Sequence, residues 1–255
     1  MLQQTQAARV APAFRRFVRR FPSLRSLASA PRREVIREWA GFGYNRRAVA
    51  LAEAARAIVR DHGGRVPREP EILRTLRGVG PYTAAAVASL GYGEPVPALD
   101  VNVRRVVARA RLGAEPTEAS ASAVEAAARA WLDRRDPGTW NQALMDLGRE
   151  VCRPVPRCGA CPIAAGCRFR RSGQTPSPPA RRQGRFEGSL RQVRGGIVAA
   201  LRDRRSMSLE ALARSLGEPV DRVRVAVRGL AADRLVKAGP SALAGQPNGR
   251  VRLPD

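Results

Sequence analysis

Apolar side chains recur at intervals of three and four residues through the first 150 positions, and no segment alternates apolar and polar residues for long. This spacing gathers the apolar side chains on one face of an α-helix. The clearest runs are Val10–Val18, Val35–Trp39, Val49–Val59 and Val124–Leu132. Short connectors rich in Gly, Pro and Ser separate them. The pattern therefore predicts an all-α fold for this part of the chain.

The pattern changes after the helical part. Residues 171–185 (RSGQTPSPPARRQGR) are poor in core-forming side chains and rich in Pro, Ser, Gly and Arg, which is typical of a linker. Amphipathic runs and two short extended segments follow, at Leu190–Leu201, Leu209–Leu216, Pro219–Ala232, Arg234–Lys237 and Arg250–Leu253. Three helices followed by a β-hairpin resemble a winged helix, so we expect a small winged-helix-like domain at 186–255.

A Gly-Val-Gly-Pro sequence separates two helix-like runs, Glu69–Arg77 and Tyr82–Leu90. The glycines permit backbone conformations that side chains would forbid, and the proline fits the first turn of a helix. Such a turn directs backbone N–H groups outward at a helix N-terminus, where they suit a phosphate oxygen. We therefore predict that Gly78, Val79 and Gly80 hold a DNA backbone without reading its sequence.

Asp100 follows this turn along the chain and lies between an apolar loop and a new helix, in the sequence Leu-Asp-Val-Asn-Val. An aspartate in this place can simply be the helix N-cap. Its position shortly after the glycine turn makes us favour a catalytic carboxylate.

The charge of the chain indicates a polyanionic partner. The 255 residues carry a formal net charge of +24, and the pI is about 11.7. Nearly all basic residues are arginines, with one lysine, Lys237, a bias that a GC-rich genome also explains. No apolar run approaches the length of a membrane span, and the first residues show no signal-peptide pattern. We expect no membrane partner and a cytoplasmic, nucleoid-associated location.

The four cysteines form one cluster with the spacing Cys152-x5-Cys158-x2-Cys161-x5-Cys167. A disulfide framework is not expected in an intracellular DNA-binding chain, so the cluster predicts a metal site. Zinc usually takes two Cys-x2-Cys pairs, and this sequence has one. A [4Fe–4S] cluster also takes four thiolates, and we favour it over zinc.

Six motifs stand in one order along the chain. They are MLQQTQ at 1–6, GFGYNRRA at 41–48, GVGPYTA at 78–84, LDVNVRRV at 99–106, WNQALMDLG at 140–148 and the cysteine cluster. As a set they resemble the helix-hairpin-helix DNA glycosylases, and within them the adenine glycosylases of the MutY type. The family carries a [4Fe–4S] cluster at this place, although its first cysteine spacing is usually one residue longer.

The resemblance implies a helix-hairpin-helix glycosylase domain at 1–170. It divides into a helical barrel with the hairpin at 1–112 and a helical part with the iron–sulfur loop at 113–170. The linker at 171–185 and the winged-helix-like domain then follow. MutY enzymes instead end in a Nudix-like domain that helps to recognise 8-oxoguanine, and we see no sign of that domain in this sequence.

The implied activity is hydrolysis of the N-glycosidic bond of adenine paired with 8-oxoguanine or guanine, by a monomer on double-stranded DNA. Asp100 would stabilise the positive charge on the sugar, with Asn102 as its partner. Gln4 would fill the gap left by the flipped base, and Tyr44 would wedge beside the opposite base. Leu2, Thr5, Gln142 and Met145 match positions that line the base pockets in the family. Ordinary packing is the alternative for each of them.

Tyr82 occupies the position where endonuclease III relatives have the lysine that forms a Schiff base and cuts the strand. A lysine-dependent lyase is therefore excluded, and we expect a monofunctional glycosylase. Tyrosine at this position is also found in thymine glycosylases that act on T·G mismatches, which makes that activity the second candidate. Gln3, Gln4 and Thr5 favour adenine.

The general acid of the family is a glutamate two residues before the methionine that corresponds to Met1. We therefore expect the natural protein to begin upstream. The chain as given should bind mismatched DNA, excise adenine very slowly or not at all, and expose apolar surface where the preceding helix would pack. A DNA-binding protein on an inactive glycosylase scaffold is the alternative outside the enzymes.

Overall fold

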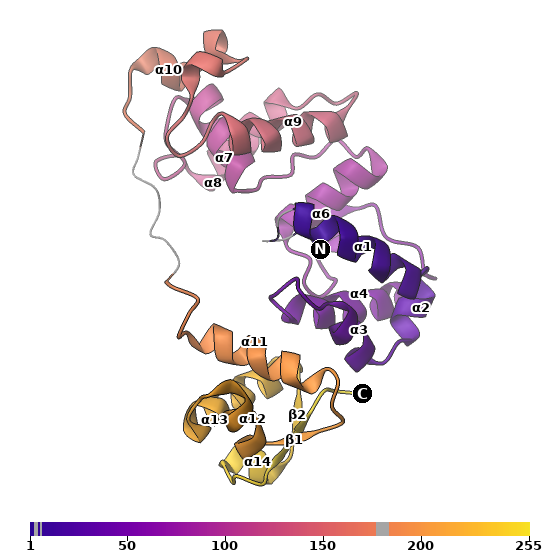
Figure 1. Cartoon of the computed structure of the whole chain (residues 1–255). Helices are drawn as coiled ribbons and strands as arrows, with labels where there is room; N and C mark the ends of the chain where they lie inside the picture. The colour runs from indigo at the N-terminus through magenta and orange to yellow at the C-terminus, as the bar shows by residue number, and fades with distance from the viewer. Residues whose placement is uncertain (3–4, 6, 177–183) are drawn as a thin grey trace. The chain divides into compact units, whose positions relative to one another are not determined.

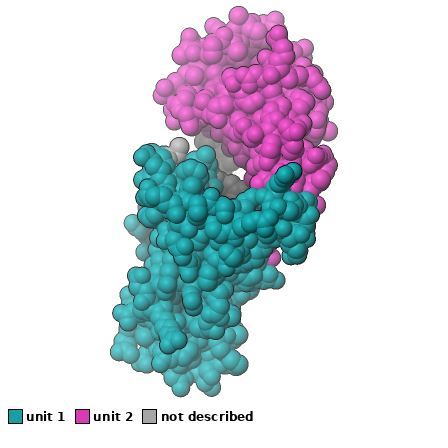
Figure 2. All heavy atoms as spheres, turned by 90° about the vertical axis from the view of Figure 1, so that its right-hand side faces the viewer, with its two compact units in different colours: residues 1–65, 183–255 teal, residues 66–182 magenta. Residues whose placement is uncertain are grey.

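The computed structural model describes residues 1–2, 5, 7–176 and 184–255, and its contacts gather the chain into two compact units (Figure 1, Figure 2). Unit 1 combines Met1–Arg65 with Gln183–Asp255, and unit 2 is Val66–Arg182. Helices dominate both units, which confirms the fold class predicted from the apolar spacing. Within the described part of the chain, no helix has the length and apolar character needed to cross a membrane.

Unit 1 begins with four helices. They are α1 (Ala7–Arg20), α2 (Leu24–Ser29), α3 (Arg32–Glu38) and α4 (Arg46–Asp61). Their core is built on aromatic side chains: Phe17 packs edge-on against Phe21 and Trp39, and Trp39 lies 5.1 Å from Phe42 between ring centroids. Large aromatic rings bury much apolar area per residue, so a few of them can fix the mutual packing of short helices.

The second part of unit 1 is the C-terminal module. Its elements are α11 (Leu190–Leu201), β1 (Met207–Ser208), α12 (Leu209–Leu216), α13 (Val220–Ala232), β2 (Lys237–Ala238), α14 (Pro240–Ala244) and β3 (Arg250–Arg252). The strands form an antiparallel sheet in the order β1-β3-β2. The three helices and β3 match the predicted segments. Strand β2 overlaps the predicted segment Arg234–Lys237 only at Lys237, and β1 and α14 are additional. The winged-helix-like character of this module stays a prediction.

The C-terminal module and helices α1–α4 share one hydrophobic core. Ion pairs reinforce the contact: Arg46 reaches Asp233 at 3.5 Å, and Arg234 reaches Glu53 at 3.2 Å. The grouping therefore differs from the borders predicted at 170 and 185, which separated the module from the N-terminal helices. Apolar periodicity shows which face of a helix is buried, but it does not show which element covers that face.

Unit 2 contains the glycine turn and the cysteines. Its elements are α5 (Pro70–Leu73), α6 (Pro81–Ala86), η1 (Val87–Gly91), α7 (Val101–Val107), η2 (Ala108–Leu112), α8 (Ala121–Trp131), α9 (Pro137–Glu150), η3 (Cys158–Ala160), η4 (Ala164–Gly166) and α10 (Arg168–Ser172). The helix predicted at Glu69–Arg77 is shorter than expected. The backbone N–H groups of Thr75 and Leu76 bond three residues back, which is the pattern of turns.

Helices α7 and α9 meet at a glycine. A Cβ atom on Gly148 would lie 2.7 Å from the Cβ of Asn102 and 2.9 Å from its carbonyl oxygen. A side chain at 148 is therefore incompatible with the present distance between the two backbones. Valine side chains of α7, including Val103 and Val106, fill the core beside this contact.

Replacing Gly148 with Ala should therefore destabilise the protein by about 1–3 kcal/mol, because the added methyl group overpacks the contact between α7 and α9. Gly195 is the matched control, because it also lies inside a helix but has open space around its Cα. Gly195→Ala should be neutral or stabilise by up to about 1 kcal/mol through helix propensity. Urea unfolding of both variants measures the difference, and equal effects would contradict the steric account.

Candidate active site and cysteine loop

The glycine turn has the geometry expected from its sequence. Gly78 has a φ of +80°, in the left-handed region that side chains disfavour. Gly80 is the N-cap of α6, and Pro81 lies in its first turn. The Val79 N–H donates to the Leu76 carbonyl at 3.1 Å and closes the turn. Binding of a phosphate by this turn stays a prediction.

Asp100 is the N-cap of α7. Its Oδ1 accepts hydrogen bonds from the backbone N–H groups of Asn102 at 2.8 Å and Val103 at 2.7 Å. Its Oδ2 accepts from the Asn102 side-chain amide at 3.1 Å. The cap that the sequence allows is therefore present, and it fixes the direction of the charge. A carboxylate has about four lone-pair sites, so these three bonds leave capacity for a further interaction.

Asn102 links Asp100 to helix α9. Its side-chain oxygen accepts from Arg105 Nη2 at 2.8 Å, and the same nitrogen donates to the Gly148 carbonyl at 2.7 Å. Arg105 Nε donates to the Cys152 carbonyl at 2.6 Å. A continuous line of hydrogen bonds thus runs from the Asp100 carboxylate to the backbone of Cys152. The partnership of Asn102 with Asp100 was expected, but Arg105 was missed. Its position among the apolar residues of α7 was the available signal.

Tyr82 and Asp100 interact electrostatically. Burial raises the pKa of the Tyr82 phenol, and the negative charge of Asp100 raises it further. The Tyr82 hydroxyl donates to Met145 Sδ at 3.7 Å, so a family-matched residue of α9 lies against it. Gln142, also on α9, is exposed, and its amide donates to Asp146 at 3.0 Å.

Asn141 is fully buried and was not singled out in the sequence. Its amide nitrogen donates to Ser89 Oγ and to the carbonyls of Val96 and Pro137, and its oxygen accepts from the Ala98 N–H at 2.7 Å. The side chain thereby ties the segment just before Asp100 to helices η1 and α9. A polar residue inside an apolar helix pattern was the signal that could have identified it.

Thr5 and Tyr44 lie in unit 1, where Arg47 contacts both. Arg47 Nη2 donates to Thr5 Oγ1 at 2.9 Å and to the Phe42 carbonyl at 3.0 Å, and its Cζ lies 5.6 Å from the Tyr44 ring centroid. Tyr44 has a φ of 44° and is 49% exposed. A non-glycine residue in the left-handed region is uncommon and marks a constrained loop. Gln4 lies outside the described residues.

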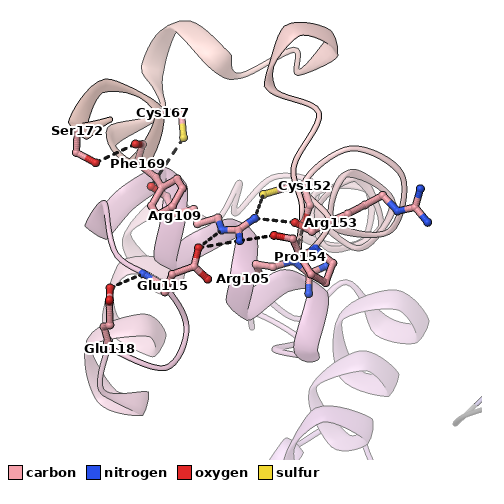
Figure 3. A network of polar contacts seen from close by, with 10 residues as sticks. All are labelled: Arg105, Arg109, Glu115, Glu118, Cys152, Arg153, Pro154, Cys167, Phe169 and Ser172. Atoms are coloured by element: carbon pink, nitrogen blue, oxygen red, sulfur yellow. Dashed lines mark hydrogen bonds and ion pairs between the residues drawn. The ribbon is translucent and has the colours of Figure 1, made fainter. Parts of the chain in front are cut away.

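The four cysteines line one cavity in unit 2, and their thiols form no disulfide. Its other walls are largely apolar and include Val106, Ala110, Ile163 and Phe169. Figure 3 shows Cys152 and Cys167 on either side of Arg109. Burial raises the pKa of the Cys152 thiol, and the hydrogen bond from Arg109 opposes this effect.

The arrangement of the thiols bears on which metal group fits. In the described part of the chain, no three Cys, His, Asp or Glu side chains are gathered closely enough to hold a single metal ion. A zinc ion would need four sulfurs about 2.3 Å from one point. Four thiols that line one largely apolar cavity suit an iron–sulfur cluster, which takes four thiolates. The residues that line the cavity therefore fit such a cluster.

Known proteins resemble this chain in sequence and in fold. The chain matches the family model described as HhH-GPD superfamily base excision DNA repair protein over residues 1–134. It is 43% identical over 204 residues to an adenine DNA glycosylase of Mycolicibacterium smegmatis, covering 80% of this chain and 69% of the relative. It is 46% identical over 206 residues to an adenine DNA glycosylase of Mycobacterium tuberculosis, and this match covers 79% of this chain and 67% of the relative. A solved thermostable thymine-DNA glycosylase matches with a TM-score of 0.62 and 29% identity, covering 67% of this chain and 80% of that one.

The family match spans more than half of the 255 residues and includes both the glycine turn and Asp100. The relatives also confirm the resemblance that the ordered motifs predicted. The chain therefore belongs to the HhH-GPD superfamily of base excision DNA repair proteins.

Proposed function

We propose that this protein is a monofunctional adenine DNA glycosylase, which hydrolyses the N-glycosidic bond of adenine paired with 8-oxoguanine or guanine in duplex DNA. The observation that carries the proposal is the oriented carboxylate of Asp100 at the start of α7. It lies in a chain that is 43% and 46% identical to two adenine DNA glycosylases.

Asp100 supplies the electrostatic part of the mechanism. Cleavage of the bond builds positive charge on the sugar, which a nearby carboxylate stabilises. Two backbone N–H groups and the Asn102 amide already hold the two oxygens of Asp100. A charge held in place before the reaction needs little reorganisation when the transition state forms.

Tyr82 defines what the site does not do. A phenol has no amino group, so Tyr82 cannot form the Schiff base through which a lysine cuts the strand. We therefore expect the product to be an abasic site in an intact strand.

The flipped base requires contacts from other parts of the chain. Gln4 would fill the gap in the stack, Tyr44 would wedge beside the opposite base, and Thr5 and Gln142 would line the base pockets. The contacts of Arg47 with Thr5 and with the Tyr44 ring support a preformed wedge loop. An exposed aromatic ring can contribute about 1–3 kcal/mol by stacking on an unpaired base.

The cysteine cavity would hold a [4Fe–4S] cluster through Cys152, Cys158, Cys161 and Cys167. When bound, the cluster would cross-link the loop covalently and support its fold. The loop itself would contribute to DNA binding through its surface, because the exposed side chains of Arg153 and Arg157 are available to phosphates.

Asp100→Asn should lower the rate of adenine excision by at least about 10²–10³-fold, because it removes the charge that stabilises the sugar cation. Binding to the mismatched duplex should be retained. Asp136→Asn is the matched control, because Asp136 is also a helix N-cap, on α9. Single-turnover assays with A opposite 8-oxoguanine, G or T measure both rates.

Comparable excision by wild-type protein and Asp100→Asn would contradict the assigned mechanism. Faster removal of thymine from a T·G duplex than of adenine would instead favour the second candidate, a thymine glycosylase. The structural match to a thymine-DNA glycosylase is the observation behind that candidate.

Anaerobically purified protein should contain four iron and four sulfide per chain and be brown. Cys161→Ser should lower the iron content and the melting temperature, since cluster binding contributes to folding. Colorimetric iron and sulfide analysis, with zinc measured in parallel, tests the cofactor. Stoichiometric zinc without sulfide is the contrary result.

DNA affinity should fall steeply as the salt concentration rises, because phosphate contacts release counterions. The double variant Arg153→Gln/Arg157→Gln should flatten the plot of log affinity against log salt by about two units. Arg129→Gln on α8, where Arg129 pairs with Glu125, should leave the slope unchanged. Fluorescence anisotropy over a salt series gives the slopes. The same slope for wild type, the double variant and Arg129→Gln would rule out phosphate contacts by Arg153 and Arg157.

A further inference from the structure

We propose that Arg109 is the positioning residue of the cysteine loop: from one buried point it fixes both ends of the loop and so shapes the cavity before a cluster binds. The inference rests on the proposed [4Fe–4S] cofactor. Arg109 is not one of the four cysteines that would bind the cluster. It also lies outside the line of hydrogen bonds that runs from Asp100 through Asn102 and Arg105 to Cys152.

Arg109 is held in the interior of unit 2. Its side chain is 2% exposed and lies beside Glu115, whose side chain is 6% exposed. Arg109 Nε and Nη2 lie 2.8 Å and 2.7 Å from Glu115 Oε1, and Arg109 Cζ lies 5.1 Å from the ring centroid of Phe169. A buried charge is tolerated when it is paired and fully hydrogen-bonded, so this pair can hold the guanidinium in one place.

The guanidinium binds the first end of the loop. Arg109 Nη1 donates to the Arg153 carbonyl at 2.7 Å and to Cys152 Sγ at 3.8 Å, and Nη2 donates to the Pro154 carbonyl at 2.9 Å (Figure 3). With the two contacts to Glu115, the five N–H donors of the arginine have five contacts. A lysine has three donors around a single nitrogen and cannot reach the same groups together.

The backbone of Arg109 binds the other end of the loop. The Cys167 thiol donates to the Arg109 carbonyl at 3.8 Å, and Phe169, two residues later, packs under the guanidinium. Arg109 lies in η2, a π-helical turn. Such turns displace backbone groups from the regular helical pattern and are frequent at functional sites. One residue thus contacts both the first and the last cysteine of the cluster motif, as Figure 3 shows.

Two consequences separate this role from ordinary packing. The ends of the loop should be held even without a cluster, because every contact of Arg109 is made by the protein itself. The donor at Cys152 Sγ should also act on a bound cluster, since hydrogen bonds to ligand sulfurs raise its reduction potential.

The experiment compares three full-length proteins: wild type, Arg109→Lys and Arg111→Lys. Arg111 is the matched control, because it lies on the same π-helical turn but is exposed and stacks on Trp131. Arg109→Lys keeps the charge beside Glu115. If it fails to fold, the double variant Arg109→Met/Glu115→Gln replaces it, since that change removes both buried charges.

Three quantities are measured. In cluster-free protein, alkylation of Cys152 should be faster in Arg109→Lys than in wild type, because the lysine loses the side-chain contact with Cys152 Sγ. After reconstitution with iron and sulfide, loss of the cluster to a chelator should be about 10–100-fold faster, the range found when a group supporting a metal ligand is removed. The reduction potential of the remaining cluster should be lower. Arg111→Lys should match wild type in all three.

The inference is overturned if Arg109→Lys and wild type have the same alkylation rate, the same rate of cluster loss to a chelator and the same reduction potential. That result would leave the proposed cofactor standing. Faster cluster loss with an unchanged potential overturns the hydrogen bond to Cys152 as a tuning contact and leaves the holding role. A wild-type protein that takes up no iron or sulfide overturns the proposed cofactor instead, and the alkylation rates then decide the holding role alone.

Discussion

The close approach of α7 and α9 at Gly148 is the constraint on which the site depends. Because no side chain separates the two backbones there, the Asn102 side chain lies against α9, and Arg105 reaches the Gly148 carbonyl. Asn102 in turn fixes one oxygen of Asp100. The orientation of the carboxylate is therefore a property of helix packing as well as of its own cap. A loss of this contact would therefore affect the carboxylate without any change to Asp100 itself.

The arginines of this chain serve two physical purposes. Most are exposed and give the chain the positive charge that a DNA partner requires. Arg105 and Arg109 are buried, and their planar groups satisfy several carbonyl oxygens at once. They organise the segment around Cys152, where a regular helix has ended and backbone acceptors need donors. Composition alone cannot separate these two groups, because both contribute equally to the net charge.

Much of the fold could be predicted from the sequence. Apolar spacing located α1, α3, α4, α8 and the helices of the C-terminal module, and the glycine turn and the cap at Asp100 followed from residue type. The shared core of unit 1, the short α5 and the roles of Arg109 and Asn141 could not be predicted. These features depend on contacts between residues far apart in sequence, which a local pattern does not encode. The family motifs predicted Tyr82 and Asp100 for one site, and the charge of Asp100 contributes to the raised pKa of the Tyr82 phenol.

The central claim is that Asp100 stabilises positive charge on the sugar. Duplexes that carry a cationic pyrrolidine or a neutral tetrahydrofuran in place of the target nucleotide, opposite 8-oxoguanine, test this by binding alone. The wild-type protein should bind the cationic duplex more tightly, since a mimic of the transition state gains from the groups that stabilise it. Asp100→Asn should lose that preference while binding the neutral duplex as before. An unchanged preference in Asp100→Asn would contradict the account.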